Sequence, residues 1–340
     1  MNHPAGSMRD AVIAFCAAAG ADPLLVQGAG GNVSWKEDDT LWIKASGTWL
    51  AQAADKDIFV PVDLAQLRVA IAAGQFDVTP VVRGNSTLRP SIETLLHALM
   101  PQPVVVHVHA VEVLAHLVRA DCLDDLNARL GAAPAWVAVP YRKPGEQLAR
   151  AVSEALAGSD ASIVFLQNHG VVIGAASPAE VMTTLTALID ALRAAPAAVQ
   201  PPRPRPAAFR IGETTYAPLA DDEVQQLATD PGLFARLPSQ WALYPDHVVF
   251  LGAHPHVADD VAGLERAVAQ GQEAPELVFV RGLGVFAQPG FSNAKQVQLR
   301  CYFDVLVRQG TAPVRTLDTA DIGELLNWDA EQYRMSLSKQ

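Results

Sequence analysis

Cysteine, aromatic residues and long apolar runs are all scarce in this chain. It has 3 cysteines and 6% aromatic residues in 340 positions. Cys16, Cys122 and Cys301 are scattered, odd in number and set among apolar residues, which excludes a disulfide framework and indicates reduced core thiols. No stretch reaches the roughly 20 apolar residues of a membrane span, and residues 1–10 lack the apolar core of a secretory signal. We therefore expect a soluble, cytoplasmic protein without a membrane partner.

Positive charge is also in deficit. Lys and Arg number 25 against 36 Asp and Glu, which gives a net charge of -11. An anionic surface disfavours a nucleic-acid partner, because the phosphate backbone is itself a polyanion. Hydrophobic residues, by contrast, make up 50% of the chain. This content allows a sizeable core, in two domains or one enlarged domain.

The spacing of apolar residues in the first part of the chain alternates between helical and extended patterns. Helices are expected at 10–19, 63–73, 111–118, 145–156 and 179–193, and after Ser91. Strands are expected at 33–35, 41–44 and 163–166, and through His109. This alternation predicts a sheet with helices on its faces, an α/β layered domain.

Composition changes sharply at residues 194–208, where prolines alternate with alanines and arginines. Such a stretch favours polyproline geometry and behaves as a semi-rigid linker. We place a first domain at 1–193 and a second, smaller α/β domain at 209–340. In the second domain strands are expected near 247–251 and 277–280, and a helix at 294–307.

A weak internal similarity links the two parts. Residues 163–171 align with residues 277–285, and each segment precedes a predicted helix. Leu283 falls where His169 stands. One interpretation is that the second part includes a degenerate, metal-free copy of part of the first; ordinary similarity between strand-turn-helix units explains the alignment almost equally well.

Histidines follow two apolar strands of the first domain. His107 and His109 follow the run Val104–Val106, and His169 follows the run Ile163–Leu166. Alternate side chains of a strand share a face, so His107 and His109 project together, as two ligands of one metal ion do. A buried strand can also carry histidines that are satisfied by hydrogen bonds alone.

A second His-x-His sequence occurs at His254 and His256, but its central proline suits a loop and no third ligand follows in a matching motif.

Upstream of the first pair, Ser91 can cap a helix that has Glu93 in its first turn. Such a glutamate can simply stabilise the helix dipole. The segments 28–34 and 44–48 are small and flexible, and their amides and hydroxyls could close on an anion.

In this order the motifs resemble those of the class II aldolase/adducin family, in particular the fuculose phosphate aldolases. The resemblance is carried by Gly31-Asn32-Val33-Ser34, Ser46-Gly47, Pro90-Ser91-Ile92-Glu93, His107-Val108-His109, Pro140-Tyr141 and Gln167-Asn168-His169-Gly170. It covers the first domain and implies a three-layer α/β fold with a central mixed sheet.

The resemblance also implies roles for individual residues. The metal ligands would be His107, His109 and His169, binding zinc or, alternatively, manganese, cobalt or iron. Glu93 would be the acid/base, and Tyr141 would assist proton transfer. A substrate phosphate would be held by Gly31, Asn32, Ser46, Gly47 and Ser91. Ile92 stands where the phosphate aldolases usually carry a second hydroxyl, so one donor to a phosphate is missing.

The expected activity is that of a lyase: metal-dependent aldol cleavage of a sugar or sugar-acid hydroxyketone, phosphorylated or not, through a metal-stabilised enediolate. A homotetramer is implied by the same resemblance. Alternatives are a decarboxylase or dehydratase of the same family, or a non-catalytic adducin-like scaffold.

The second part resembles the segment that joins aldolase to dehydrogenase in bifunctional rhamnulose phosphate aldolase/dehydrogenase proteins, through residues 282–284 and 328–332. The glycine-rich turn at 28–31 lacks the third spaced glycine of a dinucleotide fingerprint, so no NAD is expected.

Overall fold

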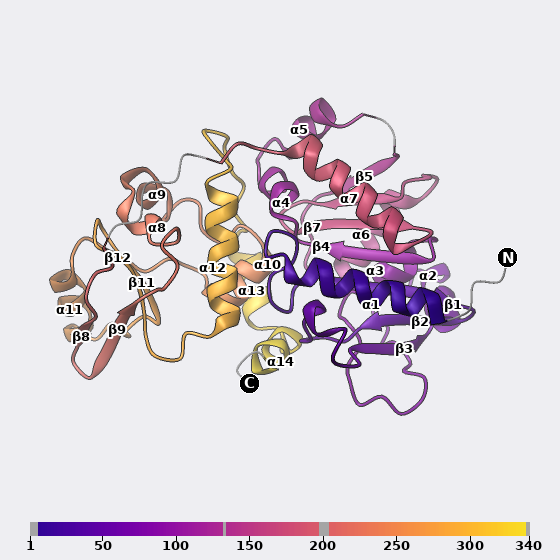
Figure 1. Ribbon diagram of the computed structural model, residues 1–340, viewed down its shortest axis with the longest axis horizontal. Coiled ribbons are helices and arrows are strands. Elements are labelled where there is room, and N and C mark those ends of the chain that lie inside the picture. Colours follow the sequence, from indigo (N-terminus) through magenta and orange to yellow (C-terminus); the bar gives the residue numbers. More distant parts are fainter. Residues whose placement is uncertain (1–5, 132–133, 197–203, 338–340) are drawn as a thin grey trace.

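Two mixed sheets, one of seven strands and one of five, organise the chain into two lobes (Figure 1). The structure is a computed structural model that describes residues 6–131, 134–196 and 204–337. The central residues of the predicted linker, 197–203, lie outside the described part. Each of the three cysteines is free and buried. Among the described residues, no helix is both long enough and apolar enough to cross a bilayer.

The first lobe is built on the seven-stranded sheet, in the order β3-β2-β1-β4-β7-β6-β5. Its strands are β1 (Asn32–Glu37), β2 (Thr40–Lys44), β3 (Phe59–Asp63), β4 (Val104–Val108), β5 (Trp136–Val139), β6 (Ile163–Leu166) and β7 (Gly170–Ala175). Neighbouring strands are antiparallel except β5 and β6, which are parallel. The sheet is therefore mixed, as predicted.

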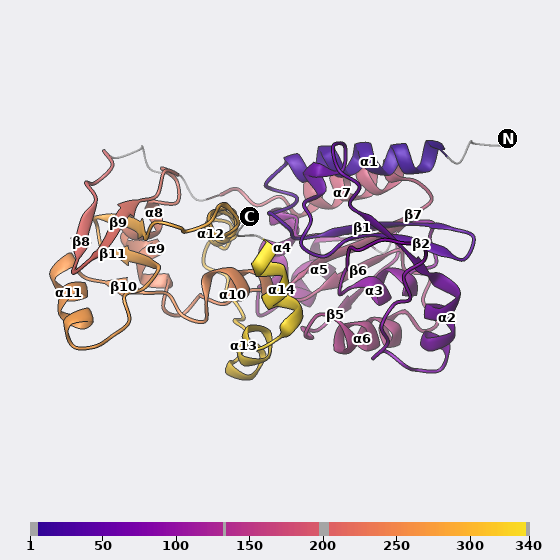
Figure 2. The ribbon, with the colours of Figure 1, turned by 90° about the horizontal axis from the view of Figure 1, so that it is seen from below.

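Helices cover both faces of this sheet (Figure 2). One face carries α1 (Gly6–Ala21), α4 (Val111–Leu117) and α7 (Pro178–Leu192); the other carries α2 (Leu64–Ala72), α3 (Thr94–Leu99) and α6 (Glu146–Leu156). The 3-10 turn η1 (Leu50–Gln52) and helix α5 (Cys122–Arg129) complete the lobe. Val104, Val106 and Val108 of β4 pack toward α1 and α7, while Val105 packs toward α3 and α6. The alternation places His107 on the α3 face, and the predicted three-layer domain is confirmed.

The second lobe contains the five-stranded sheet, in the order β10-β11-β12-β9-β8. Its strands are β8 (Phe209–Ile211), β9 (Thr214–Pro218), β10 (Val257–Ala258), β11 (Leu277–Val280) and β12 (Gly284–Ala287). Its helices are α8 (Gln226–Thr229), α9 (Pro231–Arg236), α10 (Pro245–Leu251), α11 (Val261–Ala269), α12 (Asn293–Leu306), α13 (Thr319–Leu326) and α14 (Asp329–Leu337).

The two sheets share a strand order over five strands. In both, a parallel pair joined by a helix (β5-α6-β6 and β10-α11-β11) continues through antiparallel neighbours, β7-β4-β1 and β12-β9-β8. Pro218 pairs with Phe286 at the position where His107 pairs with Val172. A different strand order would have removed the hypothesis of a degenerate copy; the shared order supports it, and Pro218 and Leu283 leave that copy without equivalents of two of the three histidines.

One sequence-based prediction is wrong. Residues 247–251, predicted as a strand, form most of helix α10. Pro245 starts the helix at its first position, and Gly252, with φ 88°, ends it. The helix is buried between the lobes on nearly all sides, so it has no polar stripe to reveal a helical period, and a short apolar run is then ambiguous.

The lobes are in direct contact. Helix α12 packs on α4, and one hydrophobic cluster includes Val111, Leu114 and Val118 together with the helices of the second lobe. Arg308 forms a 2.9 Å ion pair with Glu112 across this contact. After α12 the chain returns to the first lobe, and α14 packs against that lobe (Figure 2). The second lobe is therefore placed to contribute side chains to a site in the first.

Candidate metal centre and active site

Three histidines meet at the end of strands β4 and β7. His107 lies on β4, His109 follows it, and His169 closes the hairpin between β6 and β7. All three are buried, and their candidate ligand atoms lie within 4.8 Å of one another. No other such group of three is present among the described residues. Gly170 makes this convergence possible, because a Cβ there would lie 2.9 Å from the rings of both His107 and His109.

The ring nitrogens are oriented for a cation. Nδ1 of His107 lies 3.1 Å from the carbonyl oxygen of Val171, which can only accept, so the proton belongs on Nδ1 and Nε2 carries the lone pair. Nε2 of His107 and Nε2 of His109 lie 3.0 Å apart. Burial lowers the pKa of His107 and lowers the pKa of His169 to about 3, although Glu93 opposes this, so both rings are neutral ligands. The donor set therefore fits a divalent metal.

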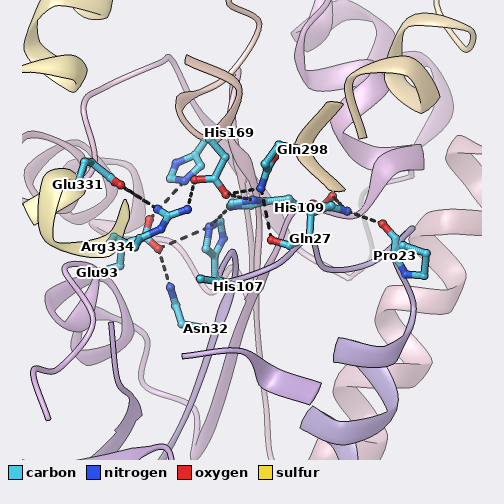
Figure 3. Close-up of polar contacts among 12 residues, drawn as sticks. Pro23, Gln27, Asn32, Glu93, His107, His109, His169, Gln298, Glu331 and Arg334 are labelled. Atoms are coloured by element: carbon cyan, nitrogen blue, oxygen red, sulfur yellow. Dashed lines mark hydrogen bonds and ion pairs between the residues drawn. The ribbon is translucent and has the colours of Figure 1, made fainter. Parts of the chain in front are cut away.

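Glu93 lies against this histidine cluster (Figure 3). Its two carboxylate oxygens are 3.6 Å from Nε2 of His107 and 3.5 Å from Nε2 of His169. Burial by itself raises the pKa of Glu93, whereas a hydrogen bond from Asn32, and the charge of His107 and His169 when these rings are protonated, lower it. The amide of Asn32 donates to Oε2 over 2.7 Å. Oε1, which faces Nε2 of His169, accepts no hydrogen bond within the described part of the chain.

The loop around Glu93 differs slightly from the prediction. Helix α3 begins at Thr94, and Glu93 is its N-cap residue rather than part of the first turn. The hydroxyl of Ser91 accepts from the amide of Glu93, and the carbonyl of Ser91 accepts from the amide of Thr94. Ser91 thus shapes the turn that presents the carboxylate.

A cleft opens over Glu93, His109 and His169. It is lined by all five residues of the predicted anion pocket: Gly31, Asn32, Ser46, Gly47 and Ser91. It is also lined by Lys44, whose Nζ donates to the carbonyl of Ala29 over 3.0 Å. Burial, and then the charge of Arg334, lower the pKa of Lys44 to about 7.

The second lobe closes one side of the cleft with Asp246, Glu331 and Arg334. Arg334 forms ion pairs with both acids, and Asp246 in turn faces Nδ1 of His109 at 3.4 Å. Figure 3 shows Arg334 and Glu331 beside the histidines. Sequence reasoning missed these residues and Lys44. Lys44 had a local signal, since it is the first residue of the flexible segment 44–48, whereas nothing local marks Asp246.

Tyr141 is not among the residues that line the cleft. It lies in the hydrophobic cluster between the lobes, and burial, followed by acids of α13, raises its pKa. Its hydroxyl makes no hydrogen bond within the described residues. His97 contacts the side-chain amide of Asn32 and the hydroxyl of Ser34, so it positions Asn32.

Comparison with known proteins gives a family match within the first lobe. The family model described as the Class II Aldolase and Adducin N-terminal domain matches residues 10–195. The protein called uncharacterized oxidoreductase YuxG, from Bacillus subtilis (strain 168), is 30% identical over 173 residues, which is 45% of this chain and 24% of that protein. The chain thus spans about a quarter of the length of this relative.

Solved structures of this class cover slightly more than half of the chain. The N-terminal class II aldolase domain of a conserved protein from Thermoplasma acidophilum is 25% identical, with a TM-score of 0.47 over 56% of this chain and 95% of that one. A sugar-phosphate aldolase from Thermotoga maritima is 17% identical, with a TM-score of 0.44 over 55% of this chain and 92% of that one. The family match covers more than half of the chain and contains the histidine cluster, so the chain belongs to the class II aldolase/adducin family.

Proposed function

We propose that this chain is a metal-dependent lyase that cleaves a hydroxyketone of the sugar or sugar-acid type by a reversible aldol reaction. One observation carries the proposal: three buried histidines share a site with a carboxylate whose Oε1 makes no hydrogen bond among the described residues. A scaffold protein has no need for this combination. A structural histidine cluster would satisfy its ring nitrogens with protein acceptors.

The ion that fits the three histidines is divalent, with zinc as the first candidate and manganese, cobalt or iron as alternatives. When bound, it supplies positive charge that stabilises the negative charge developing on the substrate's oxygens. Glu93 performs the proton transfer: it takes or returns the proton on the carbon at which the bond breaks. Asn32 holds Oε2 of Glu93 by its 2.7 Å hydrogen bond and leaves Oε1 free for this step.

The polar turns of the cleft provide the substrate's anchor. In the proposal, the amides and hydroxyls of Gly31, Asn32, Ser46, Gly47 and Ser91 bind a phosphate or another anionic end of the substrate. All five line the same cleft as Glu93. The apolar side chain of Ile92 also lines it, which favours a substrate anion that needs fewer donors than a phosphate.

Further parts of the proposal rest on the family. Tyr141 is a predicted proton-transfer residue for the departing aldehyde, the assembly is a homotetramer, and the protein works in cytoplasmic carbohydrate metabolism without NAD. The proposed domain division is a catalytic domain at 1–193, a linker at 194–208 and a second domain at 209–340.

The test is elemental analysis of the purified protein, followed by assay of aldehyde release from ketoses, ketose phosphates and keto sugar acids. We expect about one metal ion per chain, since the three histidines form one site. The double variant His107→Ala/His109→Ala should lose both the ion and the activity. The matched control His254→Ala/His256→Ala, which removes the other His-x-His pair, should retain both.

Product analysis separates this proposal from its rivals. Released carbon dioxide, or loss of water without bond cleavage between carbons, would identify a decarboxylase or a dehydratase. A wild-type protein that holds no metal even after reconstitution would overturn the proposal and favour a scaffold.

A further inference from the structure

Asp246, which comes from the second lobe, faces the metal-binding cluster of the first. We propose that Asp246 is a positioning residue for the ligand His109, so that the two lobes build the metal centre jointly. The proposal rests on the metal site of the proposed function, but not on the reaction. It gives the second domain a function in the activity of the first.

Each oxygen of the Asp246 carboxylate has its own partner. Oδ2 lies 3.4 Å from Nδ1 of His109 and 3.3 Å from the amide nitrogen of Gln298. Oδ1 forms an ion pair with Arg334 of α14, which also contacts Glu331 at 3.2 Å. Gln298 donates in addition to the backbone carbonyl of Gln27 in the first lobe, at 3.4 Å. The carboxylate is therefore held from two sides with one oxygen directed at the imidazole.

His109 differs from the other two ligands in this respect. In each ligand the outer nitrogen is Nδ1, the ring nitrogen that is not directed at the other histidines. Nδ1 of His107 faces a neutral carbonyl of its own lobe, that of Val171, and Nδ1 of His169 has no hydrogen-bond partner in the described structure. Within the described residues, His109 is thus the ligand whose outer nitrogen faces a charged acceptor. A carboxylate at that position fixes the tautomer and the ring orientation and raises the basicity of the ligand nitrogen.

The backbone of the first lobe leaves room for this approach. A Cβ at residue 30 would lie 2.9 Å from Oδ2 of Asp246 and 3.2 Å from Nδ1 of His109, so any side chain larger than that of Gly30 would wedge the two apart. The second lobe is also fastened close by: the amide of Asn168, next to His169, donates to the carbonyl of Leu243 over 2.8 Å. The hairpin that carries a ligand thus also holds the segment leading to Asp246.

The experiment measures metal affinity and the rate of metal release, by competition with a chelator, in the full-length protein reconstituted with zinc or cobalt. Asp246→Ala should weaken affinity by roughly 10- to 100-fold, as loss of such an outer partner does. Asp246→Asn, which retains an acceptor oxygen without the charge, should fall between Asp246→Ala and wild type. Gly30→Ala removes no polar group and should also weaken affinity, by separating Asp246 from His109.

Two variants separate positioning from simple docking of the lobes. Arg334→Met removes the ionic partner of Asp246 but leaves its carboxylate, and should weaken metal binding less than Asp246→Ala. Asp304→Asn changes another buried acid of the second lobe, which pairs with Arg300 and Arg308 and does not line the cleft, and should bind metal as wild type does. Circular dichroism identifies any variant that fails to fold.

Wild-type affinity in both Asp246→Ala and Gly30→Ala would overturn the inference. Equal losses in Asp246→Ala and Arg334→Met would also overturn it, because docking alone would then explain the effect. A wild type that binds no metal would overturn both this inference and the proposed function. If the metal affinities of wild type and variants follow the expected order but the wild type releases no aldehyde, only the proposed function is overturned.

Discussion

Gly170→Ala tests whether the histidine cluster depends on a missing side chain. The added Cβ would lie 2.6 Å from the carbonyl oxygen of Val108 and 2.9 Å from ring atoms of His107 and His109. An ordinary contact begins near 3.4 Å, so the carbonyl would have to retreat by about 0.8 Å and each ring by about 0.5 Å. The carbonyl belongs to β4, a central strand paired on both sides, so the side-chain rings can move more easily than the carbonyl.

Two results are expected from this substitution. Overpacking of this kind costs about 1–3 kcal/mol, so the free energy of unfolding of the metal-stripped protein should fall by that amount in urea titrations. A ring shift of about 0.5 Å exceeds the roughly 0.2 Å tolerance of metal-ligand distances, so metal affinity should fall at least about 10-fold.

Gly323→Ala is the matched control, because nothing lies within 4 Å of its added Cβ and it sits in helix α13. It should retain wild-type metal affinity and raise the free energy of unfolding by about 0.5–1 kcal/mol. Wild-type metal affinity and stability in Gly170→Ala would refute the argument that the absence of a side chain at residue 170 lets the ligands converge.

Three further predictions concern single groups. Glu93→Gln should retain metal and lower turnover by about 10²–10⁴-fold, as loss of a general base does; metal loss with it would make Glu93 a ligand instead. Tyr141→Phe removes a buried hydroxyl without a partner in the described residues, so the free energy of unfolding should rise by about 1 kcal/mol. Lower turnover in the same variant would support the proposed proton transfer by Tyr141, and unchanged turnover would contradict it. Lys44 has a pKa of about 7 in the folded protein against an ordinary lysine value of 10.5, so between these pH values the unfolded chain binds one more proton than the folded chain. The free energy of unfolding of the metal-stripped protein should therefore rise with pH from 7 to 9, by up to about 1.4 kcal/mol per pH unit from this group. Lys44→Met should show a smaller slope, and an equal slope would contradict the assignment.

Local pattern was a reliable guide to the strand buried on both faces within the sheet and to the helix that buries one face against it. The strand predicted at 163–166 is β6 with the same bounds, and the helix predicted at 179–193 is α7 shifted by one residue. The strand is a short apolar run bounded by turns, and the helix has a clear apolar period. The pattern failed for 247–251, because a helix enclosed on nearly all sides has lost the polar stripe from which its period is read.

The sequence by itself determined the order of the motifs, the spacing of His107 and His109 on one face, and the turn that carries His169. Those features are local, since they depend on the two-residue repeat of a strand and on a tight hairpin. Only the tertiary structure decided that Asp246 and Arg334 complete the same cleft. Their approach depends on the docking of α10 and α14 against the first lobe, a long-range packing that no local spacing encodes.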